Sequence, residues 1–186
     1  MENQVQKQIA ILLTDGFEEV EMTEPRKALE AEGYQTDMIT PDGGDVKAWN
    51  ESDWGDIFKA HKSIAEANPN DYDALLLPGG VMNPDKLRMD KQAVAFVKAF
   101  FEAEKPVAAI CHAPIMLIEA GVAKGKKLTS YPSLQTDLRN AGAEWIDEEV
   151  VVDGNLVTSR KPDDIPAFNQ EMTKLIREGI HVGQQV

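Results

Sequence analysis

The chain has 186 residues, and its hydrophobic content of 42% is enough to bury one substantial core, so we expect a single domain over residues 1–186. The net charge of −13 repels phosphate backbones and anionic membrane surfaces, and no apolar run is long enough to span a bilayer, which argues against nucleic-acid and membrane partners. The single cysteine excludes an internal disulfide and the polar start does not resemble a signal peptide, so we expect a cytoplasmic protein.

Apolar runs and turn residues divide the chain into alternating strands and helices. Continuous apolar runs that stop at glycine, proline or aspartate indicate buried strands, whereas apolar residues at helical spacing indicate amphipathic helices. In chain order, the patterns predict a strand at 8–14, a helix at 17–32, a strand at 34–40, short strands and turns over 45–72, a strand at 73–77, a helix at 93–101, a strand at 107–110, a helix from Pro114, a short strand at 128–130, a helix at 134–141, a hairpin of 150–153 and 156–159, a helix at 165–176 and a tail at 179–186.

Three of the predicted helices carry an apolar stripe that should face the core. The expected stripe of helix 165–176 consists of Phe168, Met172, Leu175 and Ile176. The expected stripe of helix 93–101 consists of Val94, Val97 and Phe101. The expected stripe of helix 17–32 consists of Phe17, Val20, Ala28 and Leu29.

Strands that alternate with helices favour an α/β fold, with a mostly parallel sheet sandwiched by helices on both faces. In such a sheet the functional crevice lies at the carboxyl ends of the strands. Three segments fall at those ends, namely residues 15–18, 78–80 and 111–112. Their convergence is the strongest functional signal in the sequence.

Cys111 lies where the buried strand 107–110 ends and a helix begins, because Pro114 suits a first helical turn. A side chain on a tight strand–cysteine–helix turn is pushed clear of the backbone, beside the free N–H groups of the new helix, as in a nucleophile elbow. Ala109 and Ala113 stand where a hydrolase elbow usually carries glycine, so small residues are kept. A lone buried cysteine can also be a mere small hydrophobe, but the adjacent histidine and the turn favour a nucleophile.

Four further residues are candidates for the chemistry around Cys111. His112 would accept the thiol proton and return it to a leaving group, if its ring folds back over the turn. Gly79 and Gly80 would let backbone N–H groups approach a substrate and, with the N–H of His112, stabilise an oxyanion. Glu18 is placed to reach inward, where a partly desolvated carboxyl group would donate to the sulfur and favour the thiolate. Acids are also common in a first helical turn for electrostatic reasons alone, and that alternative stays open for Glu18.

The sequence indicates neither a metal nor a cofactor. No spacing of cysteine and histidine resembles a zinc site, and His61 and His181 are expected at the surface. The glycine pair is not followed by Lys-Ser or Lys-Thr, and no G-x-G-x-x-G is present, so neither phosphate-binding motif applies.

Six sequence blocks, in order, resemble the PfpI intracellular protease family of the ThiJ/PfpI superfamily, whose core is similar to class I glutamine amidotransferase domains. The blocks are DGFEEVE (15–21), LLLPGG (75–80), AICHAP (109–114), LTSYP (128–132), NAGAEWID (140–147) and VVVDGNLVTSRKPDD (150–164). The resemblance implies a flavodoxin-like fold with Cys111 as nucleophile, His112 as its partner and Glu18 as the acid bonded to the sulfur. It also implies that an acid from a neighbouring subunit orients the histidine. Asp85 occupies that position here, one methylene shorter than the glutamate of the family, so the chain should form a homo-oligomer, either a dimer or a larger ring.

Together, the residues and the resemblance predict a stress-related cysteine-dependent hydrolase of the deglycase or glyoxalase type, acting on small reactive carbonyls or their protein adducts. An intracellular cysteine peptidase is the second hypothesis, although an extended peptide would need a long groove that the sequence does not indicate. The third, from a different class, is a redox-sensing or chaperone-like stress protein that uses oxidation of Cys111.

Overall fold

The computed structural model describes residues 6–179 and contains eleven strands and six α-helices within that range. The strands are β1 (Gln8–Leu12), β2 (Gln35–Thr40), β3 (Val46–Asn50), β4 (Asp53–Phe58), β5 (Lys62–Ser63), β6 (Ala74–Leu77), β7 (Val107–Ile110), β8 (Lys127–Leu128), β9 (Glu144–Trp145), β10 (Val151–Asp153) and β11 (Leu156–Ser159). The helices are α1 (Glu19–Ala31), α2 (Met82–Leu87), α3 (Lys91–Glu102), α4 (Ile115–Glu119), α5 (Gln135–Asn140) and α6 (Ile165–Glu178). Apart from Gly179, the predicted tail lies outside the described residues.

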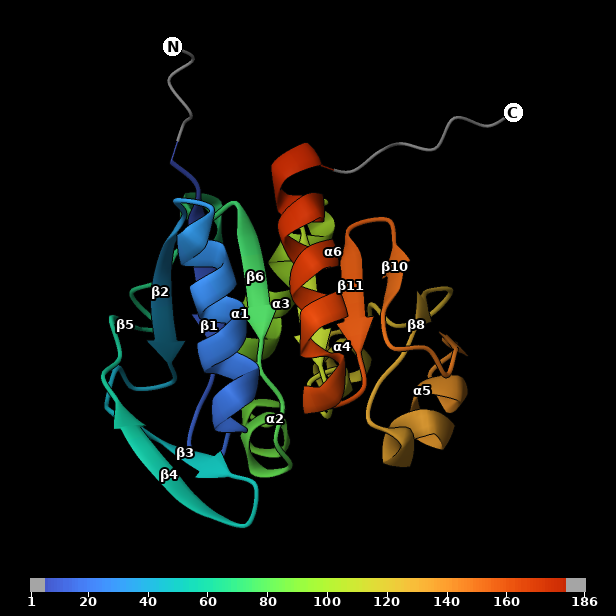
Figure 1. Cartoon of the computed structure of the whole chain (residues 1–186), viewed down its shortest axis with the longest axis horizontal. Coiled ribbons are helices and arrows are strands. Elements are labelled where there is room, and N and C mark those ends of the chain that lie inside the picture. The colour runs from blue at the N-terminus through green and yellow to red at the C-terminus, as the bar shows by residue number, and fades with distance from the viewer. Residues whose placement is uncertain (1–5, 180–186) are drawn as a thin grey trace.

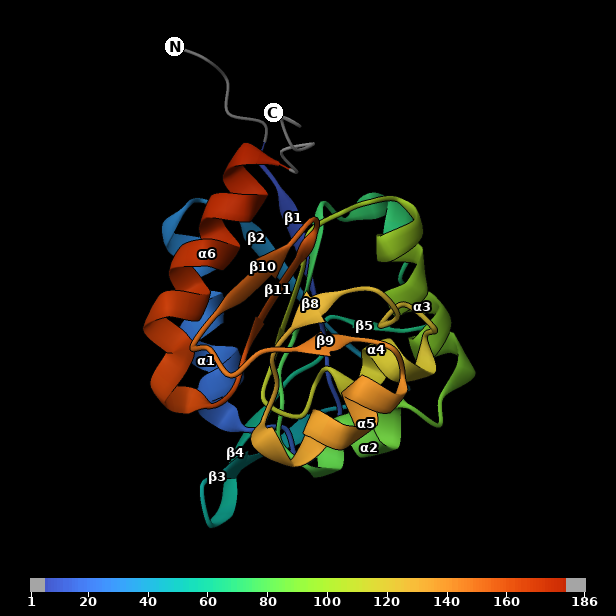
Figure 2. The same cartoon turned by 90° about the vertical axis from the view of Figure 1, so that its right-hand side faces the viewer.

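A seven-stranded sheet forms the middle layer, in the order β10-β11-β7-β6-β1-β2-β5. Its neighbouring strands are parallel except for β10 and β11, which form the predicted hairpin. Helices α1 and α6 cover one face, while α3 and α4 cover the other (Figure 1, Figure 2). The predicted α/β sandwich is therefore confirmed.

The central strands are buried on both faces because they carry apolar side chains at every position. In β7, Val107 and Ala109 pack into the core beneath α3 and α4, whereas Ala108 and Ile110 pack into the core beneath α1 and α6. Because the strand is held by both cores, Cys111, the residue after Ile110, is placed at the carboxyl edge of the sheet. Among the described residues, no helix is long and apolar enough to cross a membrane.

The predicted apolar stripe of helix α1 is only partly confirmed: Phe17 and Leu29 are buried, but Phe17 lies before the helix. The helix begins at Glu19, and the residues that it buries are Glu21, Met22, Pro25 and Leu29. These positions share one helical face, so an acid occupies a place where the sequence pattern predicts an apolar residue. Likewise, α3 buries Ala93, Phe96, Val97 and Phe100, a stripe rotated by one residue from the predicted one.

Helix α2 was not predicted, and the β3–β4 hairpin was predicted only as short strands and turns. Helix α2 follows the Gly79–Gly80 pair, and the predicted short strands of residues 45–72 include the β3–β4 hairpin, which projects beside the lower ends of β1 and α1 in Figure 1. An isolated parallel bridge between Glu18 and Trp49 ties this hairpin to the start of α1. The hairpin therefore forms one wall of the region where β1, β6 and β7 end.

Candidate active site

Cys111 lies on a strained turn between β7 and α4, as the sequence predicts. Its φ angle of +64° falls in the left-handed region, which is costly for a residue other than glycine. The N–H of Cys111 donates to Ser159 O at 3.0 Å, and its carbonyl accepts from Tyr131 N at 2.7 Å. These two hydrogen bonds hold the turn from both sides and keep the sulfur at the edge of the sheet.

The ring of His112 folds back onto the nucleophile. Its Nδ1 lies 3.2 Å from Cys111 Sγ, which is within reach for proton transfer. The ring also stacks on Tyr131, with centroids 4.7 Å apart and an interplanar angle of 21°. The structure therefore brings Cys111 and His112 together in the predicted arrangement.

The Gly79–Gly80 pair lies against the turn so closely that a side chain would not fit. A Cβ on Gly79 would stand 2.6 Å from Ile110 O and 2.7 Å from the Cβ of Cys111. Gly80 has a φ of +83°, and its backbone N–H and that of His112 both interact with the Cys111 sulfur. Two N–H donors thus lie beside the sulfur, and their use in stabilising an oxyanion stays a prediction.

Asn83 holds this glycine loop in place, a role that the sequence analysis missed. Its side chain is buried; Nδ2 donates to Pro78 O at 2.9 Å and to Gly79 O at 3.2 Å, while Oδ1 accepts from Thr14 N at 2.8 Å. The amide thus joins the loops that follow β1 and β6. Only its position shortly after the glycine pair could have indicated this role, because no periodic pattern does.

The acid beside the sulfur is Glu21 and not Glu18, which corrects the sequence-based expectation. Glu18 precedes the first turn of α1 in an extended conformation, and its Oε1 accepts from Glu51 N of the β3–β4 turn at 3.0 Å. Glu21 lies on the buried face of α1, fully inaccessible, and its Oε1 would be 2.7 Å from a Cβ on Gly79. In this conformation neither oxygen of Glu21 reaches full hydrogen-bonding geometry, although its carboxyl group interacts with Cys111 and with the Gly79 and Gly80 N–H groups.

Burial controls the protonation of these groups. Desolvation raises the pKa of Glu21 to about 8; repulsion from Glu18 adds to the rise, and the interactions with Cys111 and the glycine N–H groups oppose it. Desolvation, followed by repulsion from ionised Glu21, also raises the pKa of the Cys111 thiol. Desolvation lowers the pKa of His112. At neutral pH the thiol therefore keeps its proton, Glu21 is mostly protonated and His112 is neutral, so the expectation of a resting thiolate is not supported.

A cavity of about 520 Å³ opens over the thiol. Trp49, Val81 and Tyr131 contribute to its walls, while Cys111 and Glu21 also line it. Glu18 lines the same cavity, and desolvation raises its pKa, against the hydrogen bond from Glu51 N. This cleft, lined by these side chains, is the candidate active site.

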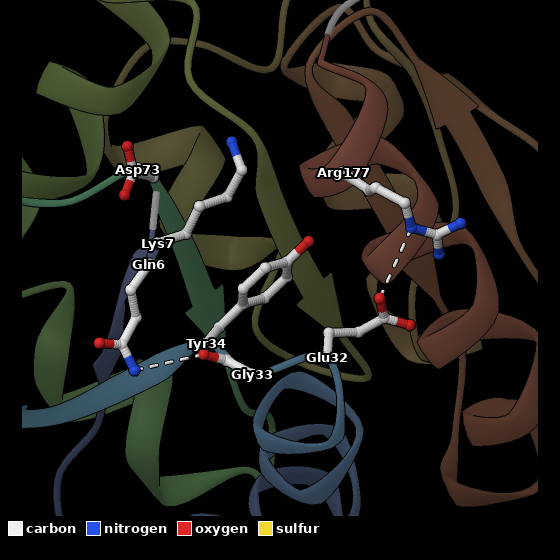
Figure 3. A pocket seen from close by; sticks show the side chains of 7 residues that line it. All are labelled: Gln6, Lys7, Glu32, Gly33, Tyr34, Asp73 and Arg177. Atoms are coloured by element: carbon white, nitrogen blue, oxygen red, sulfur yellow. Dashed lines mark hydrogen bonds and ion pairs between the residues drawn. The ribbon is translucent and has the colours of Figure 1, made fainter. Parts of the chain in front are cut away.

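A second cavity, of about 560 Å³, lies at the opposite, amino ends of the strands. Figure 3 shows Lys7, Tyr34 and Arg177 around it, with Arg177 paired to Glu32 at 3.5 Å. None of the sequence-predicted site residues lines this cavity. We therefore place the chemistry in the cleft at the carboxyl ends.

Asp85 is separate from the cleft of its own chain. It lies exposed on α2 and does not line the cavity above Cys111. His61 is exposed, as predicted, and its Nδ1 accepts from Met38 N at 2.8 Å. Residues 6–179 contain no group of three His, Cys, Asp or Glu side chains that could hold a metal ion.

Comparison with known proteins agrees with the six sequence blocks. The family model of the DJ-1/PfpI family matches residues 7–175. The chain belongs to the DJ-1/PfpI family. It is 47% identical over 171 residues to the putative cysteine protease YraA of Bacillus subtilis (strain 168), covering 92% of this chain and 99% of that protein.

Other relatives of this DJ-1/PfpI protein carry other names. The chain is 46% identical to general stress protein 18 of Bacillus subtilis (strain 168), covering 92% of this chain and 99% of that one. It is 45% identical to protein/nucleic acid deglycase 2 of Escherichia coli (strain K12), covering 91% of this chain and 98% of that one. A solved two-domain protein from Anabaena variabilis, with DJ-1/ThiJ/PfpI-like and ferritin-like domains, matches with a TM-score of 0.86 and 35% identity, covering 94% of this chain and 49% of that longer one.

Proposed function

We propose that the chain is a stress-related cysteine-dependent hydrolase that acts on small reactive carbonyls or on their adducts with protein side chains. The observation that carries this proposal is the 3.2 Å approach of His112 Nδ1 to Cys111 Sγ on the strained turn. The converging N–H groups of Gly80 and His112 support it. The names of the relatives, which include a deglycase, a putative cysteine protease and a stress protein, support the same class.

The protonation of the site indicates how the reaction begins. Because the thiol holds its proton at rest, proton transfer to His112 Nδ1 accompanies attack by the sulfur. A bond forms between the sulfur and the carbonyl carbon, and the C=O electron pair moves to oxygen, where the N–H groups of Gly80 and His112 stabilise it. His112 then returns the proton to that oxygen, which gives a thiohemiacetal. In a 2-oxoaldehyde, transfer of the carbon-bound proton to the neighbouring carbonyl carbon converts this adduct into a thioester of a 2-hydroxy acid, and water then hydrolyses the thioester to release the acid and the thiol.

Glu21 has a separate task in this scheme. As a mostly neutral acid it can donate a proton to the sulfur or to a substrate oxygen without adding a second negative charge to the cleft. An ionised carboxylate at the same position would repel the thiolate as it forms. The raised pKa of Glu21 therefore suits the chemistry of a buried sulfur nucleophile.

The size of the cleft favours a small carbonyl over a peptide. Its volume of about 520 Å³ accommodates a compact aldehyde or a modified side chain. The exposed side chains of Tyr131 and Val81 lie at its rim. An intracellular cysteine peptidase remains the second hypothesis, supported by the name of the Bacillus subtilis relative. The redox-sensor hypothesis is less favoured, because Cys111 is only 7% exposed and its thiol pKa is raised.

The test is turnover of methylglyoxal and of methylglyoxal-treated peptides, set beside casein hydrolysis. Cys111→Ala should abolish carbonyl turnover, and His112→Gln should reduce it roughly a hundredfold or more, as expected for loss of a general base. Met89→Ala is the matched control, since this other sulfur-bearing side chain is 76% exposed and does not line the cleft. Undiminished turnover in Cys111→Ala would reject the proposal, and casein hydrolysis without carbonyl turnover would select the peptidase.

We further propose that Asp85 reaches the histidine of a neighbouring subunit in a homo-oligomer. Its exposure on α2, outside its own cleft, leaves it available for such a contact. Asp85→Asn should then lower activity in the oligomer without changing its size, as judged by light scattering. An unchanged rate in an intact oligomer would contradict this role.

A further inference from the structure

The second ring nitrogen of His112 has a partner within the same chain. While Nδ1 faces the sulfur, Nε2 lies 3.2 Å from the hydroxyl oxygen of Ser133. Ser133 belongs to the 3-10 turn Pro132–Leu134, directly after the Tyr131 ring on which the histidine stacks. The imidazole is thus held at both nitrogens and on one face by side chains of its own chain.

The chemistry of proton transfer decides which tautomer this contact must support. To accept the thiol proton, Nδ1 needs a free lone pair, so the proton of the neutral ring has to reside on Nε2. The hydroxyl oxygen of Ser133 can accept the hydrogen bond from that Nε2–H. After the transfer both nitrogens carry protons, and the same oxygen still accepts, so the contact persists through the step.

We infer that Ser133 is a positioning residue that fixes His112 as the Nε2–H tautomer within each chain, before any neighbouring subunit contributes. The catalytic consequence rests on the proposed function, whereas the tautomer itself does not. Ser133 does not line the cleft above Cys111, so it acts on the base and not on the substrate. Asp85 offers no such contact within the chain, because it is exposed on α2 and outside the cleft.

Nitrogen NMR of the histidine rings reads the tautomer directly. The chain has three histidines, so ¹⁵N-histidine labelling gives few signals. The signals that disappear in His112→Gln are those of His112. Above the pKa of His112, the intact protein should show a protonated Nε2 and an unprotonated Nδ1. Ser133→Ala should shift the pattern towards a mixture of both tautomers, while Ser133→Thr, which retains the hydroxyl group, should restore the original pattern.

The kinetics provide an independent reading. Ser133→Ala should lower kcat roughly three- to tenfold, the effect of losing one hydrogen bond, with little change in KM. Ser133→Asp should raise the apparent pKa of the acid limb of the pH–rate profile by about one unit, because a carboxylate beside Nε2 favours the imidazolium. Thr136→Ala is the matched control, since it removes an exposed hydroxyl group from the neighbouring helix α5 and should change neither reading.

Each outcome decides the question. A protonated Nδ1 in the intact protein, or an unchanged tautomer and kcat in Ser133→Ala, overturns the inference. A tautomer that responds to Asp85→Asn but not to Ser133→Ala also overturns it, in favour of the neighbouring subunit. If Cys111→Ala keeps full turnover, the proposed function fails, but the tautomer measurement still stands on its own.

Discussion

Glu21 should make the protein less stable as the pH rises, and Glu21→Gln should remove that dependence. The pKa of Glu21 is about 8 in the folded state, against an ordinary value of 4.5. Between these values the folded state keeps a proton that the unfolded chain has released, so the free energy of unfolding falls as the pH increases. The stabilisation is fully present when the pH is below the ordinary pKa of glutamate. It is lost as the pH rises through the folded-state pKa of Glu21.

The magnitude follows from the linkage of one proton. The slope is about 1.4 kcal/mol per pH unit, so the whole window corresponds to on the order of 5 kcal/mol. The side chain of Glu21 is fully buried, so solvent does not screen this effect. Glutamine has nearly the same shape and cannot titrate, so the stability of Glu21→Gln relative to the natural chain should rise steadily across the window.

Urea unfolding measured at steps from about pH 4.5 to about pH 9 gives this difference directly. Other carboxyl groups titrate in both proteins and cancel in the comparison. Glu24→Gln is the control, because Glu24 lies on the same helix, pairs with Lys27 at 3.2 Å and is half-exposed. If the difference in unfolding free energy between Glu21→Gln and the natural chain stays constant within about 0.5 kcal/mol across the window, Glu21 does not hold a proton in the folded state and the reasoning fails.

Three further predictions concern the same cleft. Titration of thiolate absorbance should place the pKa of Cys111 above that of free cysteine, and Glu21→Gln should lower it by removing the repulsion of the carboxylate; a depressed value in the natural chain would contradict this. Gly79→Ala should destabilise the protein by roughly 1–3 kcal/mol in thermal unfolding and abolish activity, because the new Cβ would overlap Ile110 O; wild-type stability would show that the loop yields easily. Asn83→Ala should cost roughly 1–3 kcal/mol in urea unfolding through its lost buried hydrogen bonds, and a smaller loss would mean that the two loops hold each other without it.

The sequence predicted the sheet well because its central strands are buried on both faces. Runs such as residues 107–110 are apolar at every position, and that pattern does not depend on which helix covers them. The β3–β4 hairpin was predicted only as short strands and turns, since every residue of β4 is exposed or half-exposed and its apolar side chains do not alternate with polar ones. Helix α2 was missed because six residues that include Pro84 give no periodic signal.

The candidate site was predictable as far as chain neighbours and strand ends determine it. Cys111 and His112 are adjacent, so the tight turn alone brought them together. The choice between Glu18 and Glu21 depended on where α1 begins, because a shift of three residues exchanges a side chain on the hairpin for one on the buried face. Ser133 and Asn83 act through contacts between distant segments, which a single sequence does not reveal.

The close packing of Gly79 against Ile110, Cys111 and Glu21 divides the cleft into a floor that tolerates no change and a rim that does. Val81 is 65% exposed and Tyr131 is 41% exposed, so substitutions there would remove little buried surface from the core. Selection, or a protein engineer, can therefore retune which molecules enter the cleft by altering Val81, whereas Tyr131 belongs with the reactive machinery because its ring stacks on His112.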